Sequence, residues 1–437
     1  MDIQNRLLKV QKEMAATTSR VRLNDSQSSS NSDRSSGPPR RRGSPNLTYI
    51  NPNLLSDSSR GQPWRQKDFK YGNGILGLHQ EIEQFYAHML PTPLENAARL
   101  EVISRIESLI VKLFPHSSVE VYGSFRTALY LPTSDIDMVV IGDWTHLPLR
   151  MLENEFIMNF IADPYTIKVL DKASVPIIKL TDKRTQIKVD ISFNMKAGIQ
   201  TAKMIREYKR QYPVLPKLVM VLKQFLLQHN LNEVFTGGIS SYSLILMCIS
   251  FLQLHPRQNF KNVNLGLLLL EFLELYGRNF NYMTTGISIK NGGRHVTKEV
   301  LQKELNGDLL RPSILCIEDP LTPGNDVGKS SHGALQVKQA FETAYLTLCQ
   351  AVAPKNTQLN DCNAQSILGR VIKVSHEVIS FRKWLQRSVM KNVTKEKIAD
   401  RRLKWEANIN ASRSSSSSDD VSEFNNSHDK SSLSNKT

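Results

Sequence analysis

The stretch from Val121 to Gly142 constrains the fold and the chemistry more than any other part of the chain. It reads VYGSFRTALYLPTSDIDMVVIG, a short strand-like segment, the pair Gly123 and Ser124, and a second strand-like segment headed by two aspartates. A tight Gly-Ser turn after a strand exposes backbone N–H groups, which suits a phosphate. Because side chains alternate along a strand, Asp135 and Asp137 are predicted to face the same way.

The segment Ile187–Phe193 shows the same alternation and supplies a third aspartate. Asp190 faces away from the apolar side chains of this segment, so the three carboxylates meet if the two strands are neighbours. Like charges repel unless a cation lies between them, and Mg²⁺ prefers such oxygen ligands. Three carboxylates can hold two metal ions, one at the attacking oxygen and one at the leaving group. The pattern predicts a metal-dependent nucleotidyl-transfer site, with ordinary solvated carboxylates as the less favoured alternative.

Five motifs in this order and spacing resemble the Trf-type noncanonical poly(A) RNA polymerases, within the polymerase-beta-like nucleotidyltransferase superfamily. They are LPTSDID at 131–137, VPIIKLTD at 175–182, VDISFN at 189–194, VFTGG at 234–238 and IEDPL at 317–321. The resemblance implies an α+β fold of two lobes with the nucleotide between them. One lobe is a sheet-and-helix catalytic domain of the polymerase-beta type, and the other is a mostly helical central (PAP-associated) domain.

Composition, periodicity and the resemblance together predict five regions. These are a disordered Ser/Arg-rich segment (1–62), a segment packing on the helical lobe (63–94), the catalytic domain (95–200), the helical central domain (201–385) and a basic, then Ser-rich, disordered tail (386–437). The packing of the second region and the two domain assignments are what the resemblance implies. The two ends contain too few apolar residues to offset the entropy of ordering. Helices are expected at 78–89, 100–114, 202–212, 216–229, 240–254, 265–277, 333–349 and 371–384, with a hairpin of strands 175–180 and 187–193.

The resemblance also assigns nucleotide-binding roles along the chain. Those residues are Gly123 and Ser124 (phosphate cradle), Gly198 (backbone near the nucleotide), Lys223 (triphosphate), Ser241 (phosphate), Tyr242 (stacking on the base), Asn325 (adenine selection) and Lys329. Each has a plainer alternative from the pattern alone. Lys223 lies on an apolar helix and would extend to solvent, Ser241 would cap a helix, and Asn325 would be a turn residue.

Asn325 and Lys329 carry the expectation about the base. Related uridylyl transferases have histidine at the position of Asn325, whereas this branch has asparagine and prefers ATP. An amide can both donate to and accept from an adenine edge. Lys329 stands where close relatives have arginine, which keeps the charge but loses the planar fork.

The chain is basic, with 56 lysines and arginines against 41 acidic residues among 437 and a formal charge of +15. This favours a polyanionic partner.

Four cysteines without a Cys-x-x-Cys pair exclude a zinc knuckle within the chain, and no segment is apolar and long enough to act as a leader or membrane span. The resemblance therefore implies a separate RNA-binding (zinc-knuckle-type) subunit, a helicase and the exosome as partners, no membrane, and the nucleus, with the cytoplasm as the alternative.

Three hypotheses follow for the function. The first is template-independent transfer of AMP from ATP to an RNA 3′ end with Mg²⁺, or alternatively Mn²⁺, in which Asp135 and Asp137 bind both metals and Asp190 helps to activate the hydroxyl. The second is a uridylyl or mixed-nucleotide transferase, and the third is a catalytically silent RNA-binding scaffold. The basic stretch 382–404 is expected either to follow RNA phosphates or to be a solvated helix face.

Overall fold

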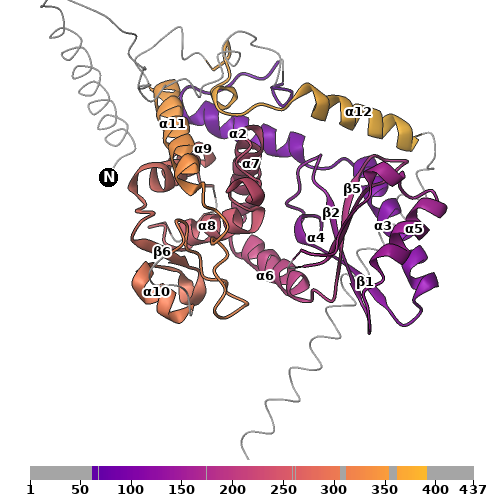
Figure 1. Ribbon diagram of the computed structural model, residues 1–437. Coiled ribbons are helices and arrows are strands. Elements are labelled where there is room, and N and C mark those ends of the chain that lie inside the picture. The colour runs from indigo at the N-terminus through magenta and orange to yellow at the C-terminus, as the bar shows by residue number, and fades with distance from the viewer. Residues whose placement is uncertain are drawn as a thin grey trace, which may run out of the picture. The chain divides into compact units, whose positions relative to one another are not determined.

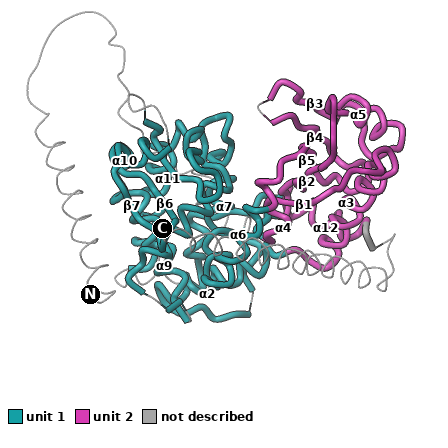
Figure 2. The backbone as a smooth tube through the Cα atoms, turned by 90° about the horizontal axis from the view of Figure 1, so that it is seen from below, with its two compact units in different colours: residues 1–90, 129–131, 200–376 teal, residues 91–128, 132–199, 377–437 magenta. Residues whose placement is uncertain are grey.

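The computed structural model describes residues 62–66, 68–173, 175–257, 259–260, 262–305, 312–353 and 362–390. Its backbone contacts divide the chain into two compact units, drawn in magenta and teal in Figure 2. The sheet unit comprises residues 91–128, 132–199 and 377 onward, and the helical unit comprises residues up to 90, 129–131 and 200–376. Both predicted disordered ends, apart from their innermost residues, lie outside the described residues.

Five strands form the sheet of the sheet unit in the order β1-β2-β5-β4-β3; Figure 1 labels β1, β2 and β5, and Figure 2 labels all five. They are β1 (Ser118–Tyr122), β2 (Ile136–Ile141), β3 (Lys168–Leu170), β4 (Ile177–Thr181) and β5 (Lys188–Phe193). The central pair β2 and β5 is parallel, and the other neighbours are antiparallel. The predicted hairpin of β4 and β5 is therefore confirmed, and β5 lies directly beside β2.

The buried face of the sheet follows from the alternation in the sequence. Ile136, Met138 and Ile191 are fully buried, and helices α3 (Pro93–Leu113) and α5 (Leu149–Met158) pack against strands of this sheet. Helix α3 begins seven residues before the predicted start. Thr92 and Glu95 form a capping box there and proline occupies the first turn, a start signal that the apolar periodicity alone does not show.

The helical unit is built around α7 (Leu215–Gln228), which contacts α2 (Ile75–Met89), α8 (Ser241–Gln253) and α9 (Leu265–Glu274). Further elements are α10 (Lys298–Glu304), α11 (Ala334–Val352) and a two-stranded sheet of β6 (Thr285–Ser288) and β7 (Arg294–Thr297). Helix α6 (Ala197–Gln211) carries the chain from the sheet unit into the helical unit. The small sheet, α5 and α10 were not predicted, because short elements give too few periods to detect.

Helix α9 ends before the predicted residue 277. The chain continues as a π-helical turn, Leu275–Asn279, against helix α11. A Cβ atom on Gly277 would lie 2.6 Å from the backbone nitrogen of Glu342, so this close approach requires glycine.

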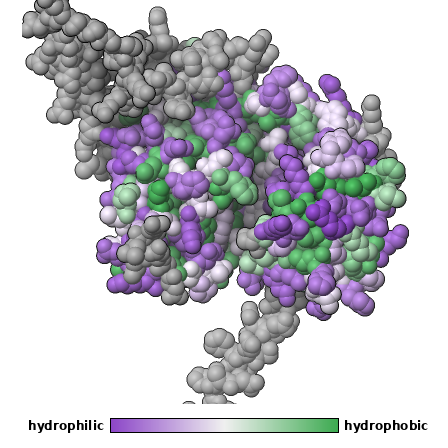
Figure 3. Space-filling view, in the orientation of Figure 1, coloured by the Kyte–Doolittle hydropathy of each residue, from purple (hydrophilic) through white to green (hydrophobic). Residues whose placement is uncertain are grey.

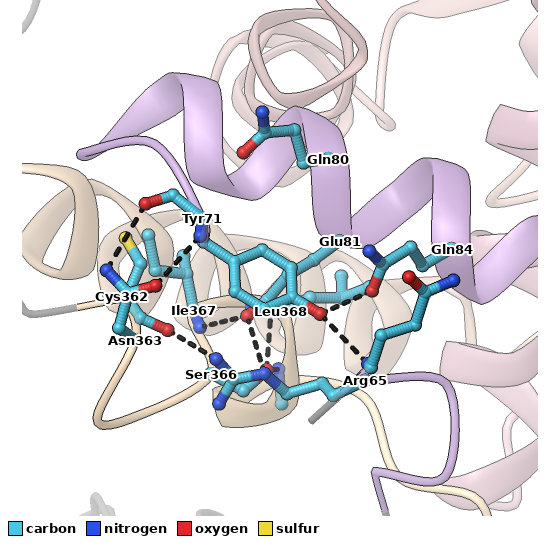
Figure 4. A network of polar contacts seen from close by, with 12 residues as sticks. Arg65, Tyr71, Gln80, Glu81, Gln84, Cys362, Asn363, Ser366, Ile367 and Leu368 are labelled. Atoms are coloured by element: carbon cyan, nitrogen blue, oxygen red, sulfur yellow. Dashed lines mark hydrogen bonds and ion pairs between the residues drawn. The ribbon is translucent and has the colours of Figure 1, made fainter. Parts of the chain in front are cut away.

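A buried carboxylate joins the two ends of the helical unit (Figure 4). Glu81 of α2 is fully buried and accepts hydrogen bonds from the Ser366 hydroxyl at 2.7 Å and the Leu368 N–H at 2.6 Å. Arg65 lies 3.5 Å from the same carboxylate and also donates to the Cys362 carbonyl. Segments almost three hundred residues apart are thus fixed to one side chain.

The last described helix, α12 (His376–Met390), differs from the prediction in both bounds. It begins five residues after the predicted Val371 and continues to Met390, beyond the expected boundary at 385. Arg382, predicted as part of a basic RNA-binding stretch, is buried and donates to both carboxylate oxygens of Glu95, at 2.6 and 2.8 Å. It therefore anchors α12 on α3, and residues 391–404 of that stretch lie outside the described residues.

The surface is mixed in character. On the face drawn in Figure 3, hydrophilic side chains cover much of both units, and apolar side chains are exposed among them. Among the described helices, none combines the length and the apolar character needed to cross a bilayer.

Candidate active site

Strand pairing brings the three predicted aspartates together. Asp137 of β2 is directly opposite Asp190 of β5, and Asp135 lies two residues before Asp137. One carboxylate oxygen from each of the three lies within 4.8 Å of the others. The parallel pairing of β2 and β5 is what turns two separate sequence motifs into one cluster.

The same cluster requires that residue 123 be a glycine. Its φ angle is +62°, and a Cβ atom there would lie 2.1 Å from Oδ2 of Asp137. Glycine is the residue that tolerates both this conformation and this approach. Gly123 and Ser124 open the short helix α4 (Gly123–Thr127), directly after β1, with Ser124 half-buried.

Burial raises the pKa of Asp190 above the ordinary aspartate value, and the negative charge of Asp135 acts in the same direction. The ammonium of Lys179, on β4, forms an ion pair with Asp190 and opposes both effects. On β1, the strand that pairs with β2, the Tyr122 hydroxyl lies 3.2 Å from the Ser192 hydroxyl. Burial raises the pKa of Tyr122 to about 12, so its hydroxyl stays protonated.

The loop before Asp135 is held by an arginine of α3. Arg99 is almost fully buried and donates to the carbonyls of Pro132 and Ser134, at 3.0 and 2.7 Å. Its guanidinium fixes the backbone immediately before the first carboxylate of the cluster.

The donor set fits a hard divalent cation. All three candidate ligands are carboxylates, two half-buried and one buried, with no histidine or cysteine in the group. Oxygen donors of this kind suit Mg²⁺ or Mn²⁺, whereas soft metals prefer nitrogen and sulfur. The residues present therefore match the cofactor that the sequence predicts, without distinguishing the two metals.

In the helical unit, one buried carboxylate connects two predicted nucleotide-binding residues. Asp319 accepts hydrogen bonds from the Tyr242 hydroxyl at 3.2 Å and from Nδ2 of Asn325 at 2.8 Å. A carboxylate that accepts at this distance requires the N–H side of the amide. Nδ2 of Asn325 therefore points at Asp319, and its carbonyl oxygen is directed elsewhere.

Lys223 does not extend to solvent, so the plainer alternative for this residue is wrong. Its side chain is buried in the helical unit, and Nζ donates to the Leu129 carbonyl at 2.7 Å. Leu129 belongs to the segment 129–131, which clusters with the helical unit although its neighbours in sequence belong to the sheet unit.

The other predicted residues occupy varied surroundings. Ser241 is exposed and is the first residue of α8, whereas the cap is Ser240, whose hydroxyl accepts from the Ser243 N–H at 3.0 Å. Gly198 packs on the Tyr122 ring, since a Cβ atom would lie 2.5 Å from it. Lys329 is exposed in the same loop as Asn325.

Two family models match the chain. One describes the central palm domain of mitochondrial-like poly(A) RNA polymerase and covers residues 78–210, and the other describes the Cid1 family of poly(A) polymerases and covers residues 264–325. An inactive noncanonical poly(A) RNA polymerase of Drosophila melanogaster, protein Trf4-2, is 43% identical over 78% of this chain and 85% of its own length. The chain belongs to the Trf-type noncanonical poly(A) RNA polymerases.

Two further comparisons refine the family assignment. Poly(A) RNA polymerase cid14 of Schizosaccharomyces pombe is 40% identical over 66% of this chain, which spans 42% of that relative's length. The solved polymerase core of TRAMP, an RNA surveillance complex, has a TM-score of 0.61 and 35% identity over 68% of this chain and 94% of that one. The predicted two-part α+β fold is confirmed.

Sequence reasoning missed three residues that contact predicted site residues or their loops: Lys179 at Asp190, Asp319 at Tyr242 and Asn325 in the helical unit, and Arg99 at the loop before Asp135. The first two lie in motifs that carry the family resemblance, VPIIKLTD and IEDPL, but neither motif shows which side chain its charged residue contacts. Lys179 is identified by its register opposite Asp190, and Asp319 by its contacts with Tyr242 and Asn325.

Proposed function

We propose that this protein is an active polynucleotide adenylyltransferase, which adds AMP from ATP to RNA 3′ ends without a template. The observation that carries the proposal is the cluster of Asp135, Asp137 and Asp190 on one face of the sheet. Family membership alone does not decide it, because the fly relative is named inactive and the fission yeast relative is named a polymerase. A silent scaffold would have no need to keep three facing carboxylates together.

In the proposed reaction, the RNA 3′ oxygen forms a bond to the α-phosphorus of ATP and the bond from that phosphorus to pyrophosphate breaks. Asp135 and Asp137 would hold the divalent cations, and Asp190 would help to activate the 3′ hydroxyl, which loses its proton as the new bond forms. Bound Mg²⁺ or Mn²⁺ supplies the positive charge that stabilises the developing charge on the phosphate oxygens. Gly123 and Ser124 at the start of α4, together with Lys223, are proposed to contact the triphosphate.

The orientation of Asn325 supports a preference for ATP. One N–H of its Nδ2 is engaged by Asp319, which leaves the carbonyl oxygen and the second N–H for a base. The oxygen can accept from the N6 amino group of adenine, a donor that uracil lacks because it carries the O4 acceptor at the corresponding position. Tyr242 is proposed to stack on the base, which adds affinity for any base and little selectivity.

The test is extension of a labelled oligo(A) primer with Mg²⁺ and each of the four nucleotides separately. The proposal expects extension with ATP that is abolished by Asp135→Ala in a protein that still folds. Equal or better use of UTP would contradict the ATP preference and favour a uridylyl or mixed-nucleotide transferase. If no nucleotide is used even after an RNA-binding subunit is added, the silent scaffold becomes the correct interpretation.

The proposal extends to partners and location. The similarity to the core of an RNA surveillance complex supports an assembly with a zinc-knuckle-type RNA-binding subunit and a helicase, acting with the exosome on nuclear RNA. Co-purification of the tagged chain from nuclear and cytoplasmic fractions checks both points.

A further inference from the structure

A row of polar side chains crosses the sheet of the sheet unit at one level. Tyr122 of β1 is opposite Asp137 of β2, Asp137 is opposite Asp190 of β5, and Asp190 is opposite Lys179 of β4. Directly opposed residues on neighbouring strands have Cβ atoms about 5 Å apart and face the same side. The row therefore ends with an ammonium next to the carboxylates.

The ammonium of Lys179 forms an ion pair with Oδ2 of Asp190, one of the proposed metal ligands. The Asp190 side chain is 12% exposed and that of Lys179 is 42% exposed, so the pair is partly shielded from water. The nearby Lys188, two residues before Asp190 on the same strand, acts on Asp190 only at longer range. Lys179 thus brings a positive charge into direct contact with the cluster.

The net charge of the cluster determines how this ion pair affects the binding of a metal ion. Three carboxylates and one ammonium leave two negative charges in excess, which one divalent cation neutralises. A cation that coordinates Asp190 must either share its carboxylate with the Lys179 ammonium or displace that ammonium. In the first case the cation and the ammonium, which are both positive, lie close together and repel each other. Lys179 therefore stabilises the facing carboxylates in the metal-free protein and weakens the binding of the metal ion.

We propose that Lys179 is a positioning residue that serves as the internal counter-ion of Asp190 and competes with a divalent cation for that carboxylate. The inference rests on the proposed role of the aspartates as metal ligands. It adds a residue that controls when the third ligand becomes available to a cation.

The test is a titration of the full-length protein with Mn²⁺, with neither nucleotide nor RNA present. The electron paramagnetic resonance signal of free Mn²⁺ measures how much of the metal is bound. Lys179→Met is expected to bind Mn²⁺ about tenfold more tightly than the unchanged protein, because a neighbouring positive charge is removed. Lys179→Arg, which keeps the charge, should stay within about threefold. Unchanged or weaker binding by Lys179→Met would overturn the proposal, since removal of a purely structural ion pair would loosen the site.

Lys183→Met is the matched control, because Lys183 forms an ion pair with Asp163, outside the cluster, at 2.6 Å. It should leave Mn²⁺ affinity unchanged. The measurement does not depend on transfer activity, so a catalytically silent protein would still show the predicted tightening. Absence of Mn²⁺ binding in every variant would overturn both this inference and the metal site.

A second measurement on the unchanged protein covers the case in which Lys179→Met does not fold. Acetic anhydride labels accessible lysine amines, and peptide mass spectrometry reports each site. Saturating Mn²⁺ is expected to release Lys179 from Asp190 and to increase its acetylation, with Lys183 as the internal reference. Acetylation of Lys179 that stays constant or falls would contradict the competition.

Discussion

At the scale of single residues, close approaches around two carboxylates decide which side chains are allowed. Asp137 leaves no room for a Cβ atom on Gly123, and Asp319 fixes which side of the Asn325 amide is turned away from it. At position 123 the approach of a carboxylate requires a glycine, and at Asn325 a carboxylate partner sets the orientation of the amide.

Gly123→Ala is expected to abolish Mn²⁺ binding and primer extension, because the added Cβ atom would collide with Oδ2 of Asp137 at 2.1 Å. Gly292→Ala is the matched control, since its φ is +86° and nothing lies within 4 Å of the added atom. The control measures only the cost of placing a non-glycine residue at a positive φ, a loss of about 1–2 kcal/mol in the free energy of unfolding measured with urea. If Gly123→Ala were destabilised only by that amount and kept its metal, the close approach would not matter.

Asp319→Asn is expected to lower the preference for ATP over UTP by about tenfold, since an amide partner no longer fixes the orientation of Asn325. The ratio of kcat/KM values for the two nucleotides is the measurement. Tyr242→Phe is the control, because it removes the other hydrogen bond to Asp319 while keeping the aromatic ring. An unchanged ratio in Asp319→Asn would show that Asn325 is not held by this carboxylate during selection.

At the scale of elements, two glutamates of α2, two positions apart, contrast a buried interaction with a surface interaction. Glu81 is fully buried and accepts from Ser366 and Leu368, whereas Glu83 forms an ion pair with Lys217 at 2.6 Å with its side chain 39% exposed. Replacing a buried acceptor leaves its buried donors unsatisfied, whereas an exposed ion pair contributes little to stability. The two positions should therefore respond very differently to the same substitution.

Glu81→Gln is expected to destabilise the protein by about 2–3 kcal/mol, because an amide NH2 in place of Oε1 would face the Ile367 N–H and the Arg65 guanidinium, which are both donors. Glu83→Gln should cost less than about 1 kcal/mol. Urea unfolding of both variants checks the difference. Equal costs would mean that the network in Figure 4 contributes no more than a surface ion pair.

Helix α12 is anchored on α3 by the buried pair of Arg382 and Glu95, so Arg382→Met is expected to cost about 3 kcal/mol by leaving Glu95 unpaired. Lys383→Met, at the exposed neighbouring position, is the control. Burial alone would raise the pKa of Glu95, but hydrogen bonds from Arg382 hold it below the ordinary value of 4.5.

The lowered pKa fixes the direction of the pH dependence. A carboxyl with a lower pKa in the folded chain stabilises the fold above pH 4.5, and this contribution disappears as the pH falls through the folded value. The stability gap between the unchanged protein and Arg382→Met should therefore be full at neutral pH and shrink below about pH 4.5. A gap that stayed constant down to about pH 3 would contradict the ion-pair explanation.

The elements also show where sequence reasoning succeeds. Alternation and helical periodicity predicted β4, β5 and the long apolar helices, because each pattern repeats over several turns or pleats. The start of α3 and the end of α9 were missed, since a capping box and the packing of Gly277 decide them. The three aspartates were predictable from spacing, whereas the partners of Lys179 and Asp319 depend on register and tertiary packing that the sequence does not display.

At the scale of the whole molecule, the positive charge is the property that concerns RNA. The excess of basic over acidic residues is +15 over the full chain, and one of its basic stretches continues past the described part of α12, from Lys391 to Lys404. A truncation at Trp384 would remove Leu385, which is 3% exposed, and part of α12, so it would confound stability with RNA binding. The informative truncation is therefore at the end of the helix.

A chain ending at Met390 is expected to keep its stability and Mn²⁺ affinity while binding single-stranded RNA more weakly and with a shallower salt dependence. For a single strand, each phosphate that the protein no longer neutralises reduces the slope of log affinity against log salt by about 0.7. Fluorescence anisotropy with labelled oligo(A) between about 50 and 300 mM salt measures the slope. The control is a full-length chain with Arg413→Gln, outside the basic stretch, which should change the slope by at most about 0.7. If the truncated chain showed the same affinity and slope as the full chain, the basic stretch would have no role in RNA binding, and the solvated alternative would hold.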